Sequence, residues 1–342
     1  MVDITVRGAG IFGLSVAWAC ARRGARVRVI DPFGPGAGAS GGVVGALAPH
    51  VPENWNDKKA FQFESLIMAG PFWAGVAEAG GLSPGYARLG RVQPVMDETG
   101  LALARAREAS AATLWQGQAE WRVEAAGGAW CPESPTGYVI RDTLSARLHP
   151  RQACAALVAA LRARGCEVLR EGPDAGRVLW ATGVAGLEAL NAGHPRQVGN
   201  GVKGQGAVLD FDARDLPQLF ADAVHIVPHE DRTTAVGSTS EREYDDATST
   251  DAQLDAVIAR ARAAVPALSG ARVLERWAGV RPRTRSRAPM LGAHPLQAGA
   301  FIANGGFKIG FGMAPKVGEV MADLMLDGVD RIPEGFRPKA SF

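Results

Sequence analysis

The chain has 342 residues, which is long enough for two domains with hydrophobic cores of their own. Hydrophobic residues make up 47% and charged residues 21%, the composition of a globular protein rather than a disordered one. The formal net charge of +2 argues against a nucleic-acid partner, and no run of about 18 apolar residues could span a membrane.

The four cysteines are scattered and include no Cys-X-X-Cys pair, so neither a disulfide framework nor a metal site is predicted. A strand pattern begins at residue 3, which leaves no room for a signal peptide. We therefore expect a cytoplasmic protein. The sequence leaves the oligomeric state open, and a homo-oligomer is possible.

The first 31 residues have the pattern of a dinucleotide-binding strand–helix–strand unit. An alternating strand at 3–7 leads into a glycine motif, an apolar helix and a second strand that ends in Asp31. We expect Gly8 to form the tight turn, Gly10 to admit a pyrophosphate and Gly13 to let the helix pack on the strand. Asp31 could accept hydrogen bonds from ribose hydroxyls. The motif alone does not distinguish NAD from FAD.

A glycine-rich and apolar loop follows, from Pro32 to His50. So much glycine is incompatible with a stable helix interior. Glycine lets a backbone lie against a ligand, and Ser40 offers a hydroxyl to a phosphate, so this loop is a candidate cofactor-binding segment. The alternative is a mobile surface loop.

Beyond this loop, helical and strand patterns alternate. A buried strand that ends in the turn Thr182-Gly183 can join the parallel sheet begun at the N-terminus. Residues 203–243 alternate instead like an antiparallel sheet. Helices are predicted at 58–80, 100–114, 150–164, 251–264 and 315–326, and strands at 88–95, 166–169 and 177–181.

In their order along the chain, five segments resemble the D-amino-acid oxidase family of FAD enzymes, and within it the glycine and sarcosine oxidases. The segments are the glycine motif ending in Asp31, Ala39-Ser40-Gly41 with Ala46-Leu47-Ala48-Pro49, Ala181-Thr182-Gly183, Trp277 to Pro282 (Trp-Ala-Gly-Val-Arg-Pro), and Gly305 to Gly310 (Gly-Gly-Phe-Lys-Ile-Gly). The resemblance covers nearly the whole chain. It implies an α/β fold in which a Rossmann-like FAD-binding domain (1–85, 144–204 and 276–342) is interleaved with an antiparallel-sheet substrate domain (86–143 and 205–275).

Through this resemblance, FAD is the expected cofactor. No cysteine follows Cys166, so the flavin–cysteine bond of sarcosine oxidases is excluded and FAD is expected to be bound non-covalently. The family's adenine-pocket valine has no clear counterpart, and Val168 and Leu169 are the nominated candidates. The predicted cofactor-binding residues are Gly8, Gly10, Ile11, Phe12, Gly13, Asp31, Ser40, Gly41, Gly42, Ala46, Leu47, Ala181, Thr182, Gly183, Gly305, Gly306, Phe307, Lys308 and Ile309, and no metal ligand is predicted.

Four side chains are the predicted catalytic residues. Arg281 matches the arginine with which the family holds the substrate carboxylate, a role suited to a planar guanidinium; the alternatives are a surface salt bridge at Arg281 and a clamp at Arg283. Lys308 stands where glycine oxidase has an arginine near the substrate, although an exposed lysine is equally compatible. His225 replaces an active-site tyrosine and could bind a carboxylate or be a hydrogen-bonded sheet histidine. His50 is a second histidine candidate.

These residues imply FAD-dependent oxidation of a small amino acid or secondary amine such as glycine, sarcosine or a D-amino acid. Hydride transfer from Cα to flavin N5 would give an imine that hydrolyses. Some sarcosine oxidases activate oxygen with a lysine, but no lysine lies between Lys203 and Lys308 in this chain. The electron acceptor therefore stays open and could be oxygen, a quinone or a partner protein. Two other functions stay open: oxidation of a modified tRNA wobble uridine, and an NAD-binding dehydrogenase or non-catalytic flavin subunit.

Overall fold

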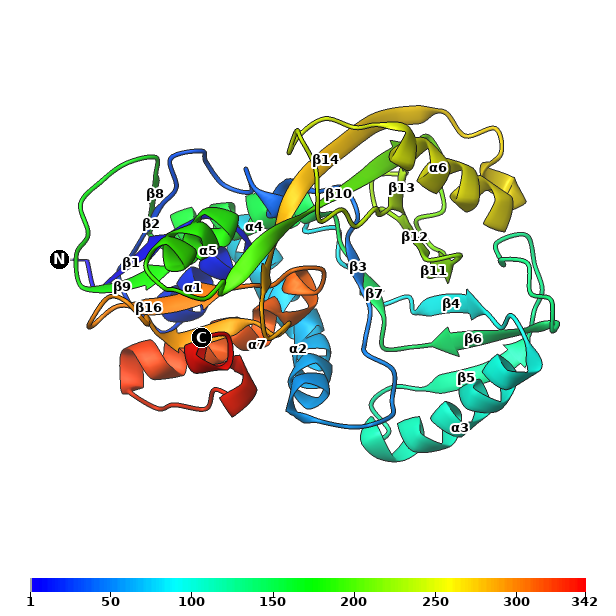
Figure 1. The fold of residues 1–342 in the computed structure, drawn as a ribbon, viewed down its shortest axis with the longest axis horizontal. Helices are drawn as coiled ribbons and strands as arrows, with labels where there is room; N and C mark the ends of the chain where they lie inside the picture. Colours follow the sequence, from blue (N-terminus) through cyan, green and yellow to red (C-terminus); the bar gives the residue numbers. More distant parts are fainter. Residues whose placement is uncertain (1) are drawn as a thin grey trace.

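The computed structural model describes residues 2–342 as two lobes joined by long strands (Figure 1). One lobe is built on a six-stranded sheet and the other on an eight-stranded sheet. A small third sheet of β3 (Ala46–Leu47) and β7 (Ala146–Arg147) lies where the two lobes meet (Figure 1). The α/β fold class expected from the sequence is confirmed.

The first lobe contains the strand–helix–strand unit predicted at the N-terminus. Its strands are β1 (Ile4–Arg7), β2 (Val27–Ile30), β8 (Glu167–Leu169), β9 (Arg177–Trp180), β15 (Met290–Ala293) and β16 (Phe301–Asn304). They lie in the order β15-β16-β9-β1-β2-β8, all parallel except the edge strand β15. The predicted strand before Thr182 is therefore β9, which pairs directly with β1.

Helices cover both faces of this sheet. Neighbouring residues of β15 and β16 point to opposite faces: Leu291 and Ala303 join the large core, whereas Met290 and Ile302 join a smaller one. The helix α5 supplies Leu187 to the smaller core. The helices of this lobe are α1 (Ile11–Arg22), α2 (Asp57–Gly80), α4 (Pro150–Ala163), α5 (Gly183–Ala192) and α7 (Gly310–Ala322), with a π-helical turn after α7 at Asp323–Asp327.

The last helix, α7, begins at Gly310, earlier than the predicted Pro315. It packs against α1. At Gly318, in the middle of α7, an added Cβ would lie 2.8 Å from the backbone oxygen of Ser15. The glycine therefore lets the two helices approach closely, which the local sequence does not reveal.

The second lobe is an eight-stranded, mainly antiparallel sheet in the order β14-β10-β13-β12-β11-β4-β6-β5. The helix α6 packs on β10, β12 and β13, and α3 packs on β5. Asp251 caps α6 by accepting a hydrogen bond from the Gln253 amide. The elements are β4 (Arg91–Pro94), α3 (Glu98–Leu114), β5 (Trp121–Ala125), β6 (Tyr138–Asp142), β10 (Gly199–Leu209), β11 (Gln218–Ala221), β12 (Val224–Pro228), β13 (Thr234–Gly237), α6 (Ala252–Ala264) and β14 (Val273–Thr284).

The two longest strands, β10 and β14, run from one lobe into the other as a paired arm (Figure 1). The predicted divisions at 204/205 and 275/276 fall inside these strands, and the exact division of the chain into domains stays a prediction. No helix among residues 2–342 is long and apolar enough to cross a bilayer. The four cysteines are free thiols.

Candidate active site

The glycine motif forms a turn between β1 and α1 into which no side chain fits. Gly8 has a φ of +107°, and a Cβ there would lie 2.3 Å from the backbone oxygen of Ala181. A Cβ on Gly13 would lie 2.0 Å from the backbone oxygen of Gly8. Glycine at these two positions therefore allows β1, β9 and α1 to approach one another at a single point.

The N-terminus of α1 presents free amides at this point. Its cap residue, Gly10, has no side chain, and the Ile11 amide donates to Ser40 Oγ at 2.9 Å. The amides of Phe12 and Gly13 have no acceptor within the described chain. Unpaired first-turn amides and the positive end of the helix dipole favour an anion, so this cradle fits the pyrophosphate of FAD.

Asp31 and Ser40, the two polar residues predicted beside the cradle, already have protein partners. The Asp31 carboxylate accepts hydrogen bonds from the amides of Ala9 (2.8 Å) and Phe33 (3.0 Å). Ser40 Oγ accepts from Ile11, which leaves its own proton available to a phosphate. Val168 and Leu169, on β8, lie beside the end of β2, where the Asp31 amide donates to the Leu169 oxygen. Contacts of these four residues with ribose, phosphate and adenine stay predictions.

The remaining predicted cofactor residues border the same region. Gly305 has a φ of +75°, and a Cβ on Gly306 would lie 3.0 Å from the Phe12 ring. The 305–309 loop therefore contacts the start of α1, although the two are far apart in sequence. Gly42 packs against the indole of Trp277, Ala46 and Leu47 form β3, and Thr182 is the cap residue of α5.

One face of the eight-stranded sheet is turned toward this cradle. Cross-strand pairing places Trp277, Gly206, Gly237, His225 and Phe220 in one row, so their Cα–Cβ directions share a face. The glycines of this row contact valine side chains of the 43–44 loop. Side chains alternate between the two faces of a strand, so every second residue of β14 counted from Trp277, including Arg281, also belongs to this face.

Arg281 lies in a cavity made by a missing side chain. Its guanidinium packs directly on Gly204, where a Cβ would overlap it. One of its five N–H donors reaches the Thr239 backbone oxygen at 3.3 Å, and no carboxylate in residues 2–342 forms an ion pair with it. Burial lowers the pKa of Arg281 to about 10, an effect that the charge of Glu241 partly offsets. Arg281 is half-buried, and a partly desolvated guanidinium with free donors is a site for a carboxylate.

Lys308 lies within electrostatic range of this arginine, and His225 lies within range of Lys308. Partial desolvation and then the charge of Arg281 lower the pKa of Lys308, although the lysine reaches solvent in the cleft. Burial, then the charges of Arg91 and Lys308, lower the pKa of His225 to about 3, so the imidazole is neutral. His225 Nδ1 is buried without a hydrogen-bond partner, which makes it an open position rather than a satisfied sheet histidine.

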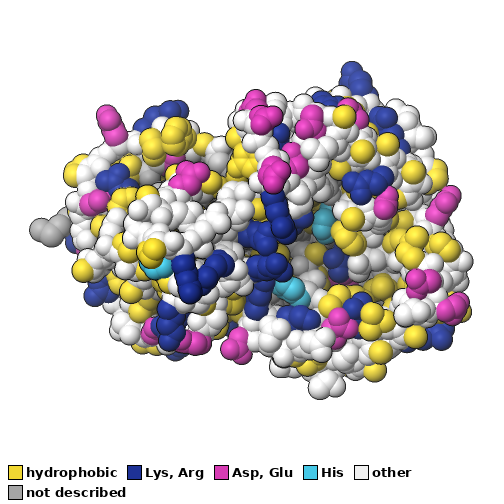
Figure 2. All heavy atoms as spheres, in the orientation of Figure 1, with side chains coloured by type: hydrophobic (Ala, Val, Ile, Leu, Met, Phe, Trp, Pro, Cys, Tyr) yellow, Lys and Arg dark blue, Asp and Glu magenta, His cyan; other side chains and the backbone are white. Residues whose placement is uncertain are grey.

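A cavity of about 310 Å³ opens beside the 305–309 loop, and Lys and Arg side chains gather in the hollow between the lobes (Figure 2). His50 lines the cavity and is fixed by Gln62, whose Oε1 accepts from both the His50 amide and Nδ1. Burial lowers the pKa of His50. Sequence reasoning missed three further lining cations, Lys58, Arg242 and Arg287, because each lies on a different segment outside any motif.

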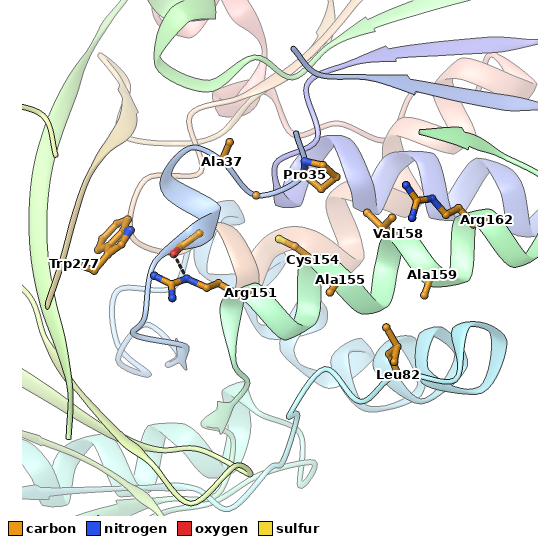
Figure 3. Close-up of a pocket in the computed structure, with 12 residues that line it drawn as sticks. Pro35, Ala37, Leu82, Arg151, Cys154, Ala155, Val158, Ala159, Arg162 and Trp277 are labelled. Atoms are coloured by element: carbon orange, nitrogen blue, oxygen red, sulfur yellow. Dashed lines mark hydrogen bonds between the residues drawn. The ribbon is translucent and has the colours of Figure 1, made fainter. Parts of the chain in front are cut away.

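A larger hollow of about 620 Å³ lies along α4, beside the loop 35–41 (Figure 3). Its lining is mainly apolar and includes Cys154 and Trp277. At its rim, Arg151 donates to the Gly41 oxygen at 2.8 Å and pairs with Glu275 at 2.6 Å. None of the four predicted catalytic residues lines this hollow, and of the four only His50 lines the smaller cationic cavity. The candidate substrate site is therefore the space beside Arg281 and Lys308.

Comparison with known proteins agrees with this geometry. The family model described as FAD dependent oxidoreductase (DAO) matches residues 3–324. ThiO of Rhizobium etli, to which an oxidoreductase role in thiamine biosynthesis is provisionally assigned, is 30% identical over 95% of this chain and 97% of its own length. Glycine oxidase of Bacillus subtilis is 30% identical over 126 residues, so the alignment spans 36% of this chain and about a third (34%) of that relative.

Solved structures share the fold at low sequence identity. Glycine oxidase of Geobacillus kaustophilus has a TM-score of 0.82 at 20% identity, covering 98% of this chain and 97% of that one. Iminodiacetate oxidase of Chelativorans sp. BNC1 has a TM-score of 0.84 at 20% identity, covering 98% and 99%. The family match excludes the NAD-binding alternative. The chain is therefore an enzyme that belongs to the DAO family of FAD-dependent oxidoreductases, with FAD as its cofactor.

Proposed function

We propose that the protein oxidises a small amine that carries a carboxylate, such as glycine, sarcosine or a D-amino acid. The observation that supports this most strongly is the half-buried guanidinium of Arg281, which has free donors and no carboxylate partner in the described chain. Such a group is costly to bury alone and is stabilised by a bound carboxylate. Relatives named glycine oxidase support a small amino acid as substrate.

The residues of the chain would hold the substrate between the two lobes. When bound, FAD supplies the hydride-accepting chemistry. Arg281 would bind the carboxylate through two hydrogen bonds and so fix the direction of the Cα–H bond. The sheet face around Trp277 would exclude water from above.

Two further groups would act on the ends of the substrate. Lys308 would add positive charge beside the carboxylate. Neutral His225, whose Nδ1 has no hydrogen-bond partner in the described chain, would accept a hydrogen bond from the substrate amine and so favour its neutral, oxidisable form. Oxygen, a quinone or a partner protein would then receive the electrons.

Anaerobic bleaching of the flavin band near about 450 nm tests this proposal. Each carboxylate amine is paired with its decarboxylated analogue: sarcosine with dimethylamine, D-alanine with ethylamine, and D-proline with pyrrolidine. We expect at least one carboxylate amine to bleach the flavin while its analogue does not. Equal bleaching by the analogues, or none by any compound including glycine, would contradict the proposal.

A further inference from the structure

The outer cavity beside the 305–309 loop has more positive charge than one substrate carboxylate requires. Lys58, Arg242, Arg283 and Arg287 line it together with His50, and its lining includes no acidic side chain. None of the four cations forms an ion pair with a carboxylate anywhere in residues 2–342. Elsewhere in the chain, by contrast, Arg151 and Arg276 pair with acids at 2.6 and 2.7 Å.

These cations come from separate parts of the chain. Lys58 lies in the first turn of α2, Arg283 on β14, Arg287 in the turn after β14, and Arg242 after β13. The Lys58 ammonium donates to the backbone oxygen of Arg287, so its charge faces the other cations rather than an acid. Like charges held together in a hollow repel one another, and a bound anion relieves that repulsion.

Phe307, which lines the outer cavity, connects it to the Arg281 site through Lys308. The Phe307 ring centroid lies 5.7 Å from Arg283 Cζ and 5.8 Å from Lys308 Nζ, and Lys308 is near enough to Arg281 for that charge to lower its pKa. Phe307 is fixed to β14 because its amide donates to the Pro282 oxygen at 3.1 Å. A volume of about 310 Å³ suits a small ligand rather than a macromolecular segment. One small molecule could therefore reach both cationic groups.

We propose that this outer cavity is a second anion-binding site, which selects amines with two anionic groups: one carboxylate on Arg281, and a second carboxylate or a phosphonate on Arg242, Arg283 and Arg287. This rests on the proposed function, because it extends the substrate held by Arg281. Arginine is suited to the role, since its planar fork binds carboxylate and phosphonate oxygens in pairs.

A series of N-substituted glycines tests the second site. Iminodiacetate carries a second carboxylate, and N-(2-hydroxyethyl)glycine is its neutral counterpart of the same length. We expect kcat/KM for iminodiacetate to exceed that for the neutral compound by at least about tenfold, the scale of one charge-assisted contact. N-(phosphonomethyl)glycine shows whether the site prefers a phosphonate. A ratio near one for both dianions would overturn the proposal.

The Arg242→Gln/Arg287→Gln double variant removes two cations from the proposed site. Both arginines are exposed, so the fold does not depend on them. We expect the preference for the dianion to fall at least about tenfold, mainly through KM. Arg196→Gln is the matched control, because Arg196 is exposed, forms no carboxylate ion pair in the described chain and does not line the cavity. The same preference in the double variant and in this control would contradict the proposal.

A binding measurement separates this proposal from the proposed oxidation. Glutarate and butyrate lack an amine, and their dissociation constants can be measured by equilibrium dialysis with the FAD-loaded protein. We expect glutarate to bind at least about tenfold more tightly, and the double variant to lose this difference. If no amine bleaches the flavin but glutarate is still preferred, the oxidation proposal fails and the second anion site stands. Equal binding of the two acids would reject the site.

Discussion

The glycine cradle at the start of α1 and the cationic cleft under the eight-stranded sheet are built in opposite ways. The cradle depends on atoms that are missing: at Gly8 and Gly13 a single Cβ would overlap the backbone of a neighbouring segment. The cleft depends on long charged side chains, among them Arg281 and Arg283 from β14 and Lys308 from the 305–309 loop. We propose that the first binds the cofactor through backbone amides and the second binds the substrate through guanidinium and ammonium groups.

Under this proposal, the cradle holds the cofactor and the cleft selects the substrate. A backbone cradle has little freedom to change, because its shape follows from one turn and one helix end. A side-chain cleft can be altered one residue at a time without disturbing the fold. Variants in the cradle should therefore affect cofactor content and stability together, whereas variants in the cleft should affect turnover and selectivity.

The largest effect is expected from Gly13→Ala in the cradle. The added Cβ would lie 2.0 Å from the Gly8 oxygen, which forces α1 away from β1 and costs about 1–3 kcal/mol of stability, together with loss of bound FAD. Gly75→Ala is the control, because Gly75 is also helical and a Cβ there meets nothing within 4 Å. Absorbance ratios and thermal unfolding measure both effects. Full FAD content and unchanged stability in Gly13→Ala would contradict the prediction, because they would show that the cradle accepts a Cβ at this position.

A smaller effect on stability is expected from pH. Burial holds the pKa of His225 near 3, against an ordinary 6.5, and also lowers the pKa of His229. Between those values the unfolded chain binds protons that the folded chain does not, so stability is full above pH 6.5 and falls as the pH drops below it. For His225 the loss is about 2 kcal/mol at pH 5.

Thermal unfolding of the wild type and of His225→Asn between pH 7.5 and 4.5 checks this. We expect the melting temperature of the wild type to fall with pH and that of the variant to fall less steeply. Parallel curves would mean that His225 is not buried in its neutral form, and would weaken its assigned place under the sheet.

The cradle could be predicted from the sequence because the residues that form it are close together in the chain. The glycine spacing, the alternating strands on either side and the acid at Asp31 all lie within 31 residues. The parallel placement of β9 and the antiparallel character of the second sheet also followed from apolar patterning. Contacts between distant segments could not be predicted in this way. Examples are the hydrogen bond from the Ile11 amide to Ser40 and the close approach of α1 to α7 at Gly318.

The cleft was only partly predictable. The Trp277–Pro282 segment pointed to Arg281, but nothing local distinguished Arg281 from Arg283. Both arginines lie on the same face of β14, and the structure separates them through packing: Arg281 lies on Gly204, whereas Arg283 lines the outer cavity and faces Phe307. Lys58 and Arg242 could not be found from the sequence, because their proximity exists only after the two lobes pack together.

The rate of anaerobic flavin reduction by a saturating monocarboxylate amine, compared between Arg281→Gln and Arg283→Gln, tests the central claim most directly. Both variants remove one positive charge from β14, so they differ only in position. We expect Arg281→Gln to retain FAD and to lose about two to four orders of magnitude in rate, and Arg283→Gln to lose less than about tenfold. Equal losses, or a larger loss in Arg283→Gln, would contradict the assignment of Arg281 as the carboxylate clamp.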